Sequence, residues 1–264
     1  MKVVCIQMDI AFGQPEENIK KATLKLEEAL HEQPDVIVLP ELWTTGYDLT
    51  RLPEIADQNG EKTKAFLSSF AKKHHVAIVG GSVANDHGAG IANTMYIFSK
   101  EGEQIGTYDK LHLFKLMDEH LYLTSGKTEN MFTLEDTSCA GMICYDIRFP
   151  EWIRVHTSKG AEVLFVVAEW PLPRLAHWKA LLISRAIENQ CYVVACNRSG
   201  SDPNNVFAGH SLIIDPWGDI VAEAGEQEEM ISGIIDPQLV ASVRKQIPIF
   251  SDRRTEFYSF SFQK

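Results

Sequence analysis

Three residues that can take up or release protons stand at the ends of predicted strands. Glu41 follows the apolar run DVIVLP, Lys110 follows the strand-like run IGTYD, and Cys144 closes the run CAGMIC. Side chains at the ends of strands in α/β proteins project into a crevice while the sheet holds their backbone in place. The placement therefore favours a shared reactive site.

A carboxylate, an ammonium group and a thiol form a chemically sensible set. A free thiol has a pKa of about 8.5, so only a few per cent is thiolate near pH 7 and the group needs activation. Burial and a second carboxylate raise the pKa of a glutamate, while a neighbouring ammonium favours the thiolate. Taken singly, Cys144 also suits a core position, Lys110 a solvated loop and Glu41 a turn cap.

The segments around these residues make the pattern more specific. In chain order they read LPELWTTGYD (39–48), YDKLHLF (108–114), DEHLYLTSG (118–126), GMICYDIRFPEWIR (141–154) and HWKALLISRAIENQCYVVACNRSG (177–200). Together they resemble the nitrilase superfamily of carbon–nitrogen hydrolases, over about residues 3–248. A glutamate, a lysine and a cysteine in this order, each with its flanking segment, are far more specific than any lone short motif.

The resemblance implies an α/β fold, a four-layer α-β-β-α sandwich, and a homodimer that packs sheet-flanking helices together. It also implies roles for individual residues. Glu41 is the general base, Lys110 stabilises the oxyanion, Cys144 is the nucleophile, and Glu119 is a second glutamate of the site. The backbone N–H of Tyr145 is expected to assist Lys110. Neither a metal nor an organic cofactor is required by this chemistry.

The amino-acid sequences of these segments are most similar to the omega-amidase branch, and this resemblance implies hydrolysis of 2-oxoglutaramate and 2-oxosuccinamate. Arg174 lies in a loop after a predicted strand and is the candidate for binding a substrate carboxylate, and Tyr47 and Trp170 are candidates for the pocket wall. The alternative for Arg174 is a solvated surface position. Arg148 could also bind a carboxylate, but the preferred interpretation is a buried structural ion pair, with Glu151 or another acid. The alternatives are N-carbamoyl amide or nitrile hydrolysis, or a non-catalytic scaffold on the same fold.

Composition limits the partners. The 264 residues carry 25 basic and 36 acidic side chains and a net charge of −11, which argues against nucleic-acid binding and an anionic membrane surface. No apolar run approaches the roughly 20 residues of a membrane span. The five cysteines lack disulfide-framework spacing and indicate reduced thiols in the cytoplasm, and no His or Cys spacing is typical of a metal site.

Apolar periodicity predicts one carbon–nitrogen hydrolase domain over residues 1–264, in which strands and helices alternate. The aromatic-rich tail after Pro248 is expected to pack against something, such as a partner subunit. Predicted strands cover 3–8, 35–39, 76–80, 93–99, 104–108, 139–144, 163–167, 192–197, 210–215, 219–222 and 230–235. Predicted helices begin near 15 and cover about 62–74, 150–158 and 175–190.

Overall fold

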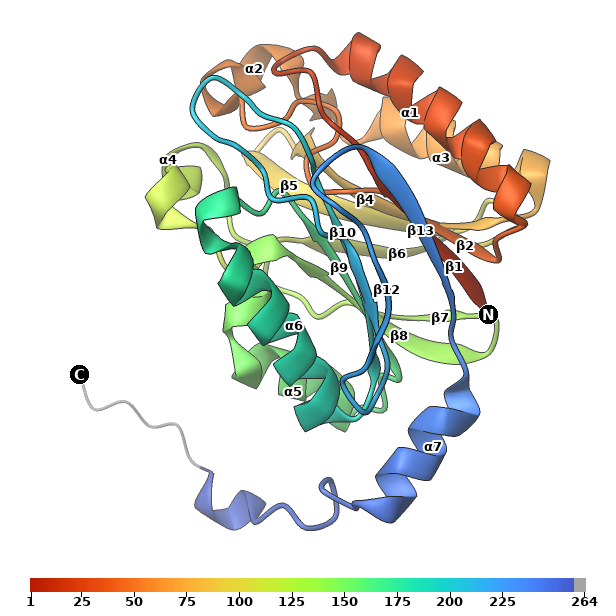
Figure 1. The fold of residues 1–264 in the computed structure, drawn as a ribbon. Helices are drawn as coiled ribbons and strands as arrows, with labels where there is room; N and C mark the ends of the chain where they lie inside the picture. Colours follow the sequence, from red (N-terminus) through yellow and green to blue (C-terminus); the bar gives the residue numbers. More distant parts are fainter. Residues whose placement is uncertain (259–264) are drawn as a thin grey trace.

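Two β-sheets lie face to face at the centre of the computed structural model, which describes residues 1–258 (Figure 1). The first sheet has the strand order β13-β1-β2-β4-β5-β6, with β3 paired to β4. Its strands are β1 (Lys2–Gln7), β2 (Val36–Val38), β3 (Asp57–Gln58), β4 (Ala77–Asp86), β5 (Ile91–Phe98), β6 (Gln104–Asp109) and β13 (Glu229–Ile234).

The second sheet has the strand order β12-β11-β10-β9-β8-β7. Strands β8, β9 and β10 run parallel to one another. Strand β7 pairs antiparallel with β8, β11 pairs antiparallel with β10, and β12 pairs antiparallel with β11. The strands are β7 (Met131–Leu134), β8 (Thr137–Ile143), β9 (Val163–Ala168), β10 (Tyr192–Asn197), β11 (Leu212–Ile214) and β12 (Ile220–Glu223).

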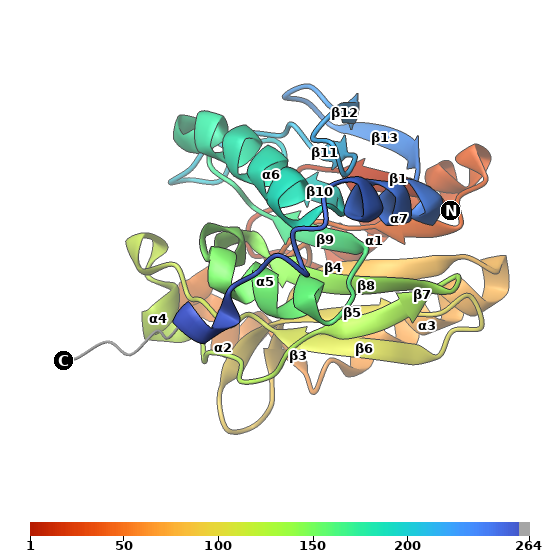
Figure 2. The same cartoon turned by 90° about the horizontal axis from the view of Figure 1, so that it is seen from below.

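Helices cover the outer face of each sheet, so the layers run α-β-β-α (Figures 1 and 2). Helices α1 (Pro15–Ala29) and α3 (Glu61–His74) cover the first sheet, and α5 (Pro150–Ser158) and α6 (Leu175–Asn189) cover the second. The other helices are α2 (Leu52–Ile55), α4 (Glu119–Tyr122) and α7 (Pro237–Gln246), with 3-10 turns η1 (Leu30–Glu32), η2 (Leu49–Arg51), η3 (Lys115–Met117), η4 (Cys144–Arg148), η5 (Leu172–Arg174) and η6 (Thr255–Phe257).

Local sequence explains where the long helices begin and which face they bury. Helix α1 begins with Pro15, whose missing N–H costs nothing in a first turn. Its buried side chains recur at three- and four-residue spacing, at Asn18, Ala22, Leu26 and Ala29. The intervening positions are mostly Lys and Glu, so this helix lays one apolar stripe on the sheet.

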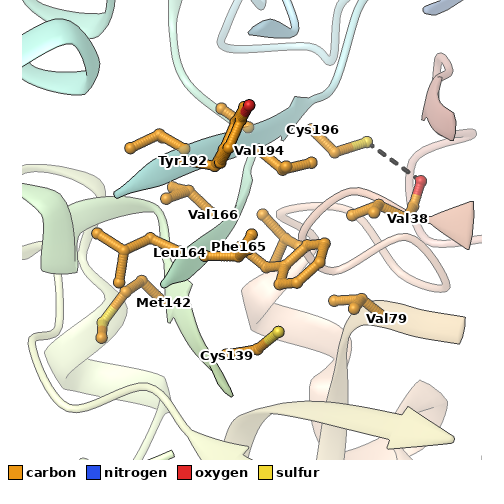
Figure 3. Packing of buried hydrophobic residues seen from close by; sticks show 14 of the residues in the cluster. Val38, Val79, Cys139, Met142, Leu164, Phe165, Val166, Tyr192, Val194 and Cys196 are labelled. Carbon is orange, nitrogen blue, oxygen red and sulfur yellow. Dashed lines mark hydrogen bonds between the residues drawn. The ribbon is translucent and has the colours of Figure 1, made fainter. Parts of the chain in front are cut away.

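The inner faces of the two sheets pack against each other in an apolar layer (Figure 3). Phe165 of β9 lies there with Val38 and Val79 of the first sheet, and all three are fully buried. The thiol of Cys196 on β10 donates to the carbonyl oxygen of Val38 at 3.4 Å. Each such apolar side chain contributes about 1.5–3 kcal/mol of burial free energy, and together they fix how the sheets face each other.

Strand direction brings several strand ends to one edge of this sandwich. Strands β2 and β4 are parallel, and β6 has the direction of β4 because each pairs antiparallel with β5. Strands β8, β9 and β10 are parallel too. Residues that follow β2 and β6 can therefore meet residues that follow β8, β9 and β10.

The four-layer sandwich expected from the resemblance is confirmed. Most strands and helices predicted from periodicity are present, but the predicted strand 76–80 extends to Asp86, and β7 and α7 were not predicted. In the tail, Phe250 lies beneath the guanidinium groups of Arg154 and Arg244, while Phe257 and Tyr258 are exposed. Phe260 and Phe262 fall outside the described residues. Within residues 1–258, no helix is both long and apolar enough to cross a bilayer.

Candidate active site

Glu41 lies in the loop after β2, and its side chain is fully buried between the two sheets. Oε1 accepts hydrogen bonds from Lys110 Nζ at 2.7 Å and from Asn93 Nδ2 at 2.8 Å. Oε2 accepts one from the backbone N–H of Glu169, also at 2.8 Å. Both carboxylate oxygens are thus held, one by the first sheet and one by the second. This fixes the orientation of the carboxylate.

A glycine allows the close approach that positions this loop. Gly81 has a φ of +61°, and a Cβ built on it would lie 2.0 Å from the carbonyl oxygen of Pro40, the residue before Glu41. The N–H of Ser82 donates to the same carbonyl at 3.1 Å. Only glycine combines this backbone conformation with the space available.

Lys110 follows β6, and its ammonium group is fully buried between two carboxylates. Nζ lies 2.7 Å from Glu41 Oε1 and 2.7 Å from Glu119 Oε1. Burial opposes the charge, but the two carboxylates outweigh it and raise the pKa of Lys110 well above its usual value. The lysine is therefore a fixed cation, with its position set by both glutamates.

Glu119 begins the short helix α4 and is buried. Its Oε1 also accepts from the hydroxyl of Tyr47 at 2.5 Å, and its Oε2 accepts from the backbone N–H of Phe114 at 2.7 Å. Burial raises the pKa of Glu119, Lys110 lowers it and Glu41 raises it again, so that the net direction is upward. Lys110, Glu41 and Glu119 form one coupled group of charges.

Cys144 stands at the point where β8 becomes the 3-10 turn η4. Its φ of +45° is unusual for a residue with a Cβ. The side chain is almost buried, and burial together with Glu41 raises the pKa of the thiol, while Lys110 lowers it. The sharp turn directs the thiol toward the same edge as Glu41.

Asp146 connects the turn of Cys144 to the segment that carries Lys110. The fully buried carboxylate accepts from the N–H of Ile143 at 3.1 Å and the hydroxyl of Tyr108 at 2.8 Å. It also accepts from the N–H of His112 at 3.1 Å and lies 2.8 Å from His112 Nδ1. A single carboxylate therefore links the residues on either side of Lys110 to the residue before Cys144.

A narrow pocket leads from solvent to Cys144. It is lined by side chains from the segment before α4, from η4 and from the loop after β9, namely Phe114, Met117, Cys144, Tyr145, Arg148, Glu169, Trp170, Pro171 and Arg174. Arg148 lies over the ring of Trp170, 4.7 Å from its centroid, and Arg174 lies over the ring of Phe114 at 5.4 Å. Two cations thus share one pocket wall.

The structure brings most of the sequence-predicted residues together. Cys144, Tyr145, Trp170 and Arg174 line the pocket, and the other four, Glu41, Tyr47, Lys110 and Glu119, form the hydrogen-bonded group beside it. The prediction for Arg148 is wrong, because it forms no salt bridge with Glu151 or any other acid of residues 1–258. Its contacts are Trp170 and a 3.4 Å hydrogen bond to His177 Nδ1. The turn η4 directs the side chain into the pocket instead.

Two buried ionisable side chains at this edge were not predicted. Glu169 follows β9 and Arg198 follows β10, and Glu169 Oε2 lies 2.7 Å from Arg198 Nη1. Arg198 Nη2 donates to the carbonyl of Ile10 at 2.7 Å, and its guanidinium lies over the ring of Phe207 at 4.1 Å. The sequence held one signal that could have revealed Glu169. This acidic residue directly follows the apolar run VLFVVA, and Cys144 likewise stands at the end of an apolar run.

The comparisons with known proteins agree with this geometry. The family model for carbon-nitrogen hydrolases matches residues 2–245. The chain is 57% identical over 256 residues to a 2-oxoglutaramate amidase of Bacillus subtilis, covering 97% of this chain and 98% of that one.

The chain belongs to the carbon-nitrogen hydrolase family.

Other relatives extend the comparison beyond Bacillus. The chain is 30% identical to an omega-amidase of Homo sapiens, with 100% of this chain and 98% of that one covered. The crystal structure of a carbon-nitrogen hydrolase superfamily protein of Xanthomonas campestris, described as carrying an arsenic adduct in its active site, superposes with a TM-score of 0.90. That protein is 30% identical, and 100% of this chain and 99% of that one are covered. The nitrilase-superfamily resemblance read from the motifs is thereby confirmed.

Proposed function

We propose that this carbon-nitrogen hydrolase is an omega-amidase that uses Cys144 to convert 2-oxoglutaramate, or the shorter 2-oxosuccinamate, to the dicarboxylate and ammonia. The observation that carries the proposal is the pocket itself, which places a thiol beside a buried Glu41–Lys110–Glu119 group and two guanidinium groups on its wall. The 57% identity to an amidase of that specificity supports the choice of substrate.

The first step is attack by the thiol on the amide carbonyl carbon. Burial and, after it, Glu41 raise the pKa of the Cys144 thiol, so the resting group is a thiol and the base must remove its proton during attack. In the proposed mechanism Glu41 takes that proton as the sulfur–carbon bond forms. The fixed orientation of its carboxylate, held from both sheets, means that little reorganisation is needed.

The developing oxyanion requires positive charge or N–H donors at the same point. Lys110 supplies a fixed ammonium group, and the backbone N–H of Tyr145 belongs to the first turn of η4, where N–H groups lack intrahelical partners. Each donor of this kind is typically worth about 3–4 kcal/mol of the activation barrier. Glu119 acts as a positioning residue, because it holds Lys110 from the side opposite Glu41.

The remaining steps return the site to its resting state. Glu41 gives its proton to the leaving nitrogen, the carbon–nitrogen bond breaks, and ammonia departs from a thioester on Cys144. Water then attacks the thioester carbonyl while Glu41 takes a proton from it. The carbon–sulfur bond breaks, the carboxylic acid is released, and the proton returns to the thiol. Water is the one co-substrate, and neither step consumes an oxidant or a reductant.

The distal carboxylate of the substrate is proposed to bind Arg174 and Arg148. Neither guanidinium forms a salt bridge with an acid of residues 1–258, although both line the pocket. Burial and the neighbouring Arg174 lower the pKa of Arg148, Tyr145 and Cys144 act in the opposite direction, and the net shift is downward. Bringing a carboxylate between the two cations relieves this repulsion and adds paired, charge-assisted hydrogen bonds. An uncharged amide gains neither.

The test is ammonia release from the purified protein. The substrates are 2-oxoglutaramate, 2-oxosuccinamate, glutamine, an N-carbamoyl amine and a simple nitrile. We expect turnover of the two oxo-acid amides that disappears in Cys144→Ala and persists in the matched control Cys191→Ala, whose thiol is buried away from the pocket. Activity on the nitrile or the N-carbamoyl amine alone would retain the mechanism and discard the substrate.

A second measurement tests the carboxylate site. Arg174→Ala is expected to raise KM about tenfold or more for 2-oxoglutaramate while changing KM for an uncharged primary amide less than twofold. The reason is that only 2-oxoglutaramate has a carboxylate that would lose its cationic partner. An equal effect on both substrates would remove Arg174 from the substrate site.

We further propose that residues 1–264 form a single domain, that the protein is a cytoplasmic homodimer, and that it binds neither nucleic acid nor membranes. A wide groove between α5 and the C-terminal segment supports the dimer, because apolar and charged side chains of both line it, among them Val155, Ile249 and Tyr258. An apolar core shared by both sheets supports the single domain. Five free cysteines support the cytoplasmic location, and the net charge of −11 supports the absence of nucleic-acid and membrane binding. Sedimentation equilibrium tests the dimer, and a purely monomeric protein would contradict it.

A further inference from the structure

Glu169 is a buried carboxyl group on the pocket wall that the mechanism above does not use. Its side chain is fully buried and lines the pocket together with Cys144. Oε2 accepts a hydrogen bond from Arg198 Nη1 at 2.7 Å. Oε1 is buried and has no hydrogen-bond partner among residues 1–258. A buried polar atom left without a partner is costly, so it is a candidate for contact with a ligand.

The position of Glu169 lies between the two ends of the proposed substrate. Its backbone N–H donates to Glu41 Oε2 at 2.8 Å, which puts it beside the group that reacts with the amide. The next residue is Trp170, whose ring lies under the guanidinium of Arg148, the group proposed to bind the distal carboxylate. Glu169 therefore faces the part of a bound molecule that joins the amide to the carboxylate.

The surroundings of Glu169 favour its neutral form. Burial raises its pKa to about 8, against the opposing effect of Arg198, and the negative charges of Glu41 and Asp202 act in the same direction as burial. Oε2 is committed as the acceptor from Arg198, so a proton on this carboxyl group resides on Oε1. The free atom is then a hydrogen-bond donor.

We propose that Glu169 is a specificity-determining residue that donates a hydrogen bond from Oε1 to the 2-oxo oxygen of the substrate. The inference rests on the proposed omega-amidase function. A 2-oxo acid amide has one acceptor besides its amide and its carboxylate, the ketone oxygen, and a neutral carboxyl group is a suitable donor for it. Selection follows because a substrate without the ketone leaves Oε1 unpaired.

The test compares two substrates that differ only in the 2-oxo group, 2-oxoglutaramate and 5-amino-5-oxopentanoate. We expect Glu169→Ala to lower the ratio of their kcat/KM values about tenfold, the effect of one hydrogen bond. Glu169→Gln retains an N–H donor and an acceptor for Arg198, so its ratio is expected within threefold of the wild-type value. Because each ratio is taken within one protein, a loss of folded material cancels. An unchanged ratio in Glu169→Ala would overturn the proposal.

The pH dependence supplies a second readout, available even if Glu169→Ala does not fold. The wild-type preference for the 2-oxo substrate is expected to fall as pH rises through about 8, because the donor proton is lost. In Glu169→Gln the preference should stay constant over that range, and parallel curves for the two proteins would refute the role. If the wild-type protein hydrolyses neither substrate, the omega-amidase proposal fails; turnover of both with no effect of Glu169 leaves that proposal standing and removes this one.

Discussion

Replacing Lys110 with Met removes a cation that lies between two buried carboxylates. Nζ is 2.7 Å from Glu41 Oε1 and 2.7 Å from Glu119 Oε1, and all three side chains are fully buried. Methionine has a similar length but no charge. Breaking a buried ion pair from one side costs about 3–5 kcal/mol of unfolding free energy, because the remaining charge stays buried without a partner. We expect Lys110→Met to lose stability of that size near pH 7.

The loss depends on pH in a definite direction. Burial and Glu41 already raise the pKa of Glu119, and Lys110 is the main group that lowers it. Without Lys110 the folded-state pKa rises further above the unfolded value, so the stability of the variant is retained at low pH and lost as pH rises. The difference in unfolding free energy between wild type and Lys110→Met should therefore narrow as pH falls from 8 to 5.

Urea unfolding at several pH values measures this difference, and ammonia release measures the activity. Loss of an oxyanion donor is expected to lower kcat by about 100- to 1,000-fold. Lys100→Met is the matched control, because Lys100 pairs with Glu135 on the surface, where solvent screens the pair and its loss changes stability little. If Lys110→Met were as stable as Lys100→Met, or if its stability loss were the same at pH 5 and pH 8, the assignment of a buried, coupled charge group would be wrong.

Three further predictions concern the supports of the site. Gly81→Ala should cost about 1–3 kcal/mol and reduce activity, since its Cβ would meet the carbonyl of Pro40; denaturant unfolding and kcat measure the two effects. Asp146→Asn should lower kcat about tenfold and change KM less than twofold, because the link between the Lys110 segment and the turn of Cys144 is weakened. A raised KM with an unchanged kcat would contradict this prediction. Burial raises the pKa values of Cys139 and Cys191 to about 12, so iodoacetamide at pH 8 should leave both unmodified by mass spectrometry, and rapid alkylation of the folded protein would refute their burial.

The sequence predicted the parts of the fold that depend on local pattern. Short apolar runs such as 35–39 and 163–167 became strands, and three- to four-residue periodicity from Pro15 onward became a helix, because burial on one face is encoded in neighbouring residues. The strand β7 and the helix α7 were not predicted, because the apolar pattern of β7 is brief and that of α7 is interrupted by polar residues. Tertiary packing alone stabilises such elements.

The flanking segments also predicted the group of Glu41, Lys110, Glu119 and Cys144, since each segment is read along the chain and marks a strand or helix end. The contacts that the structure gives to Glu169 and Arg148 were not accessible in this way. The bond from the N–H of Glu169 to Glu41 joins residues 128 positions apart and crosses from one sheet to the other. No local pattern specifies it, because it depends on how the two sheets face each other.

By itself, therefore, the sequence determined most of the elements, the family and the residue types available for chemistry. The tertiary structure decided which of these side chains meet. It paired Glu169 with Arg198 and directed Arg148 into the pocket. Among residues 1–258, one carboxyl oxygen of Glu169 has no hydrogen-bond partner and Arg148 has no acidic partner. The physical reason is that strand direction and the apolar layer between the sheets bring distant strand ends to one edge, where charges are buried only if partners arrive from other segments.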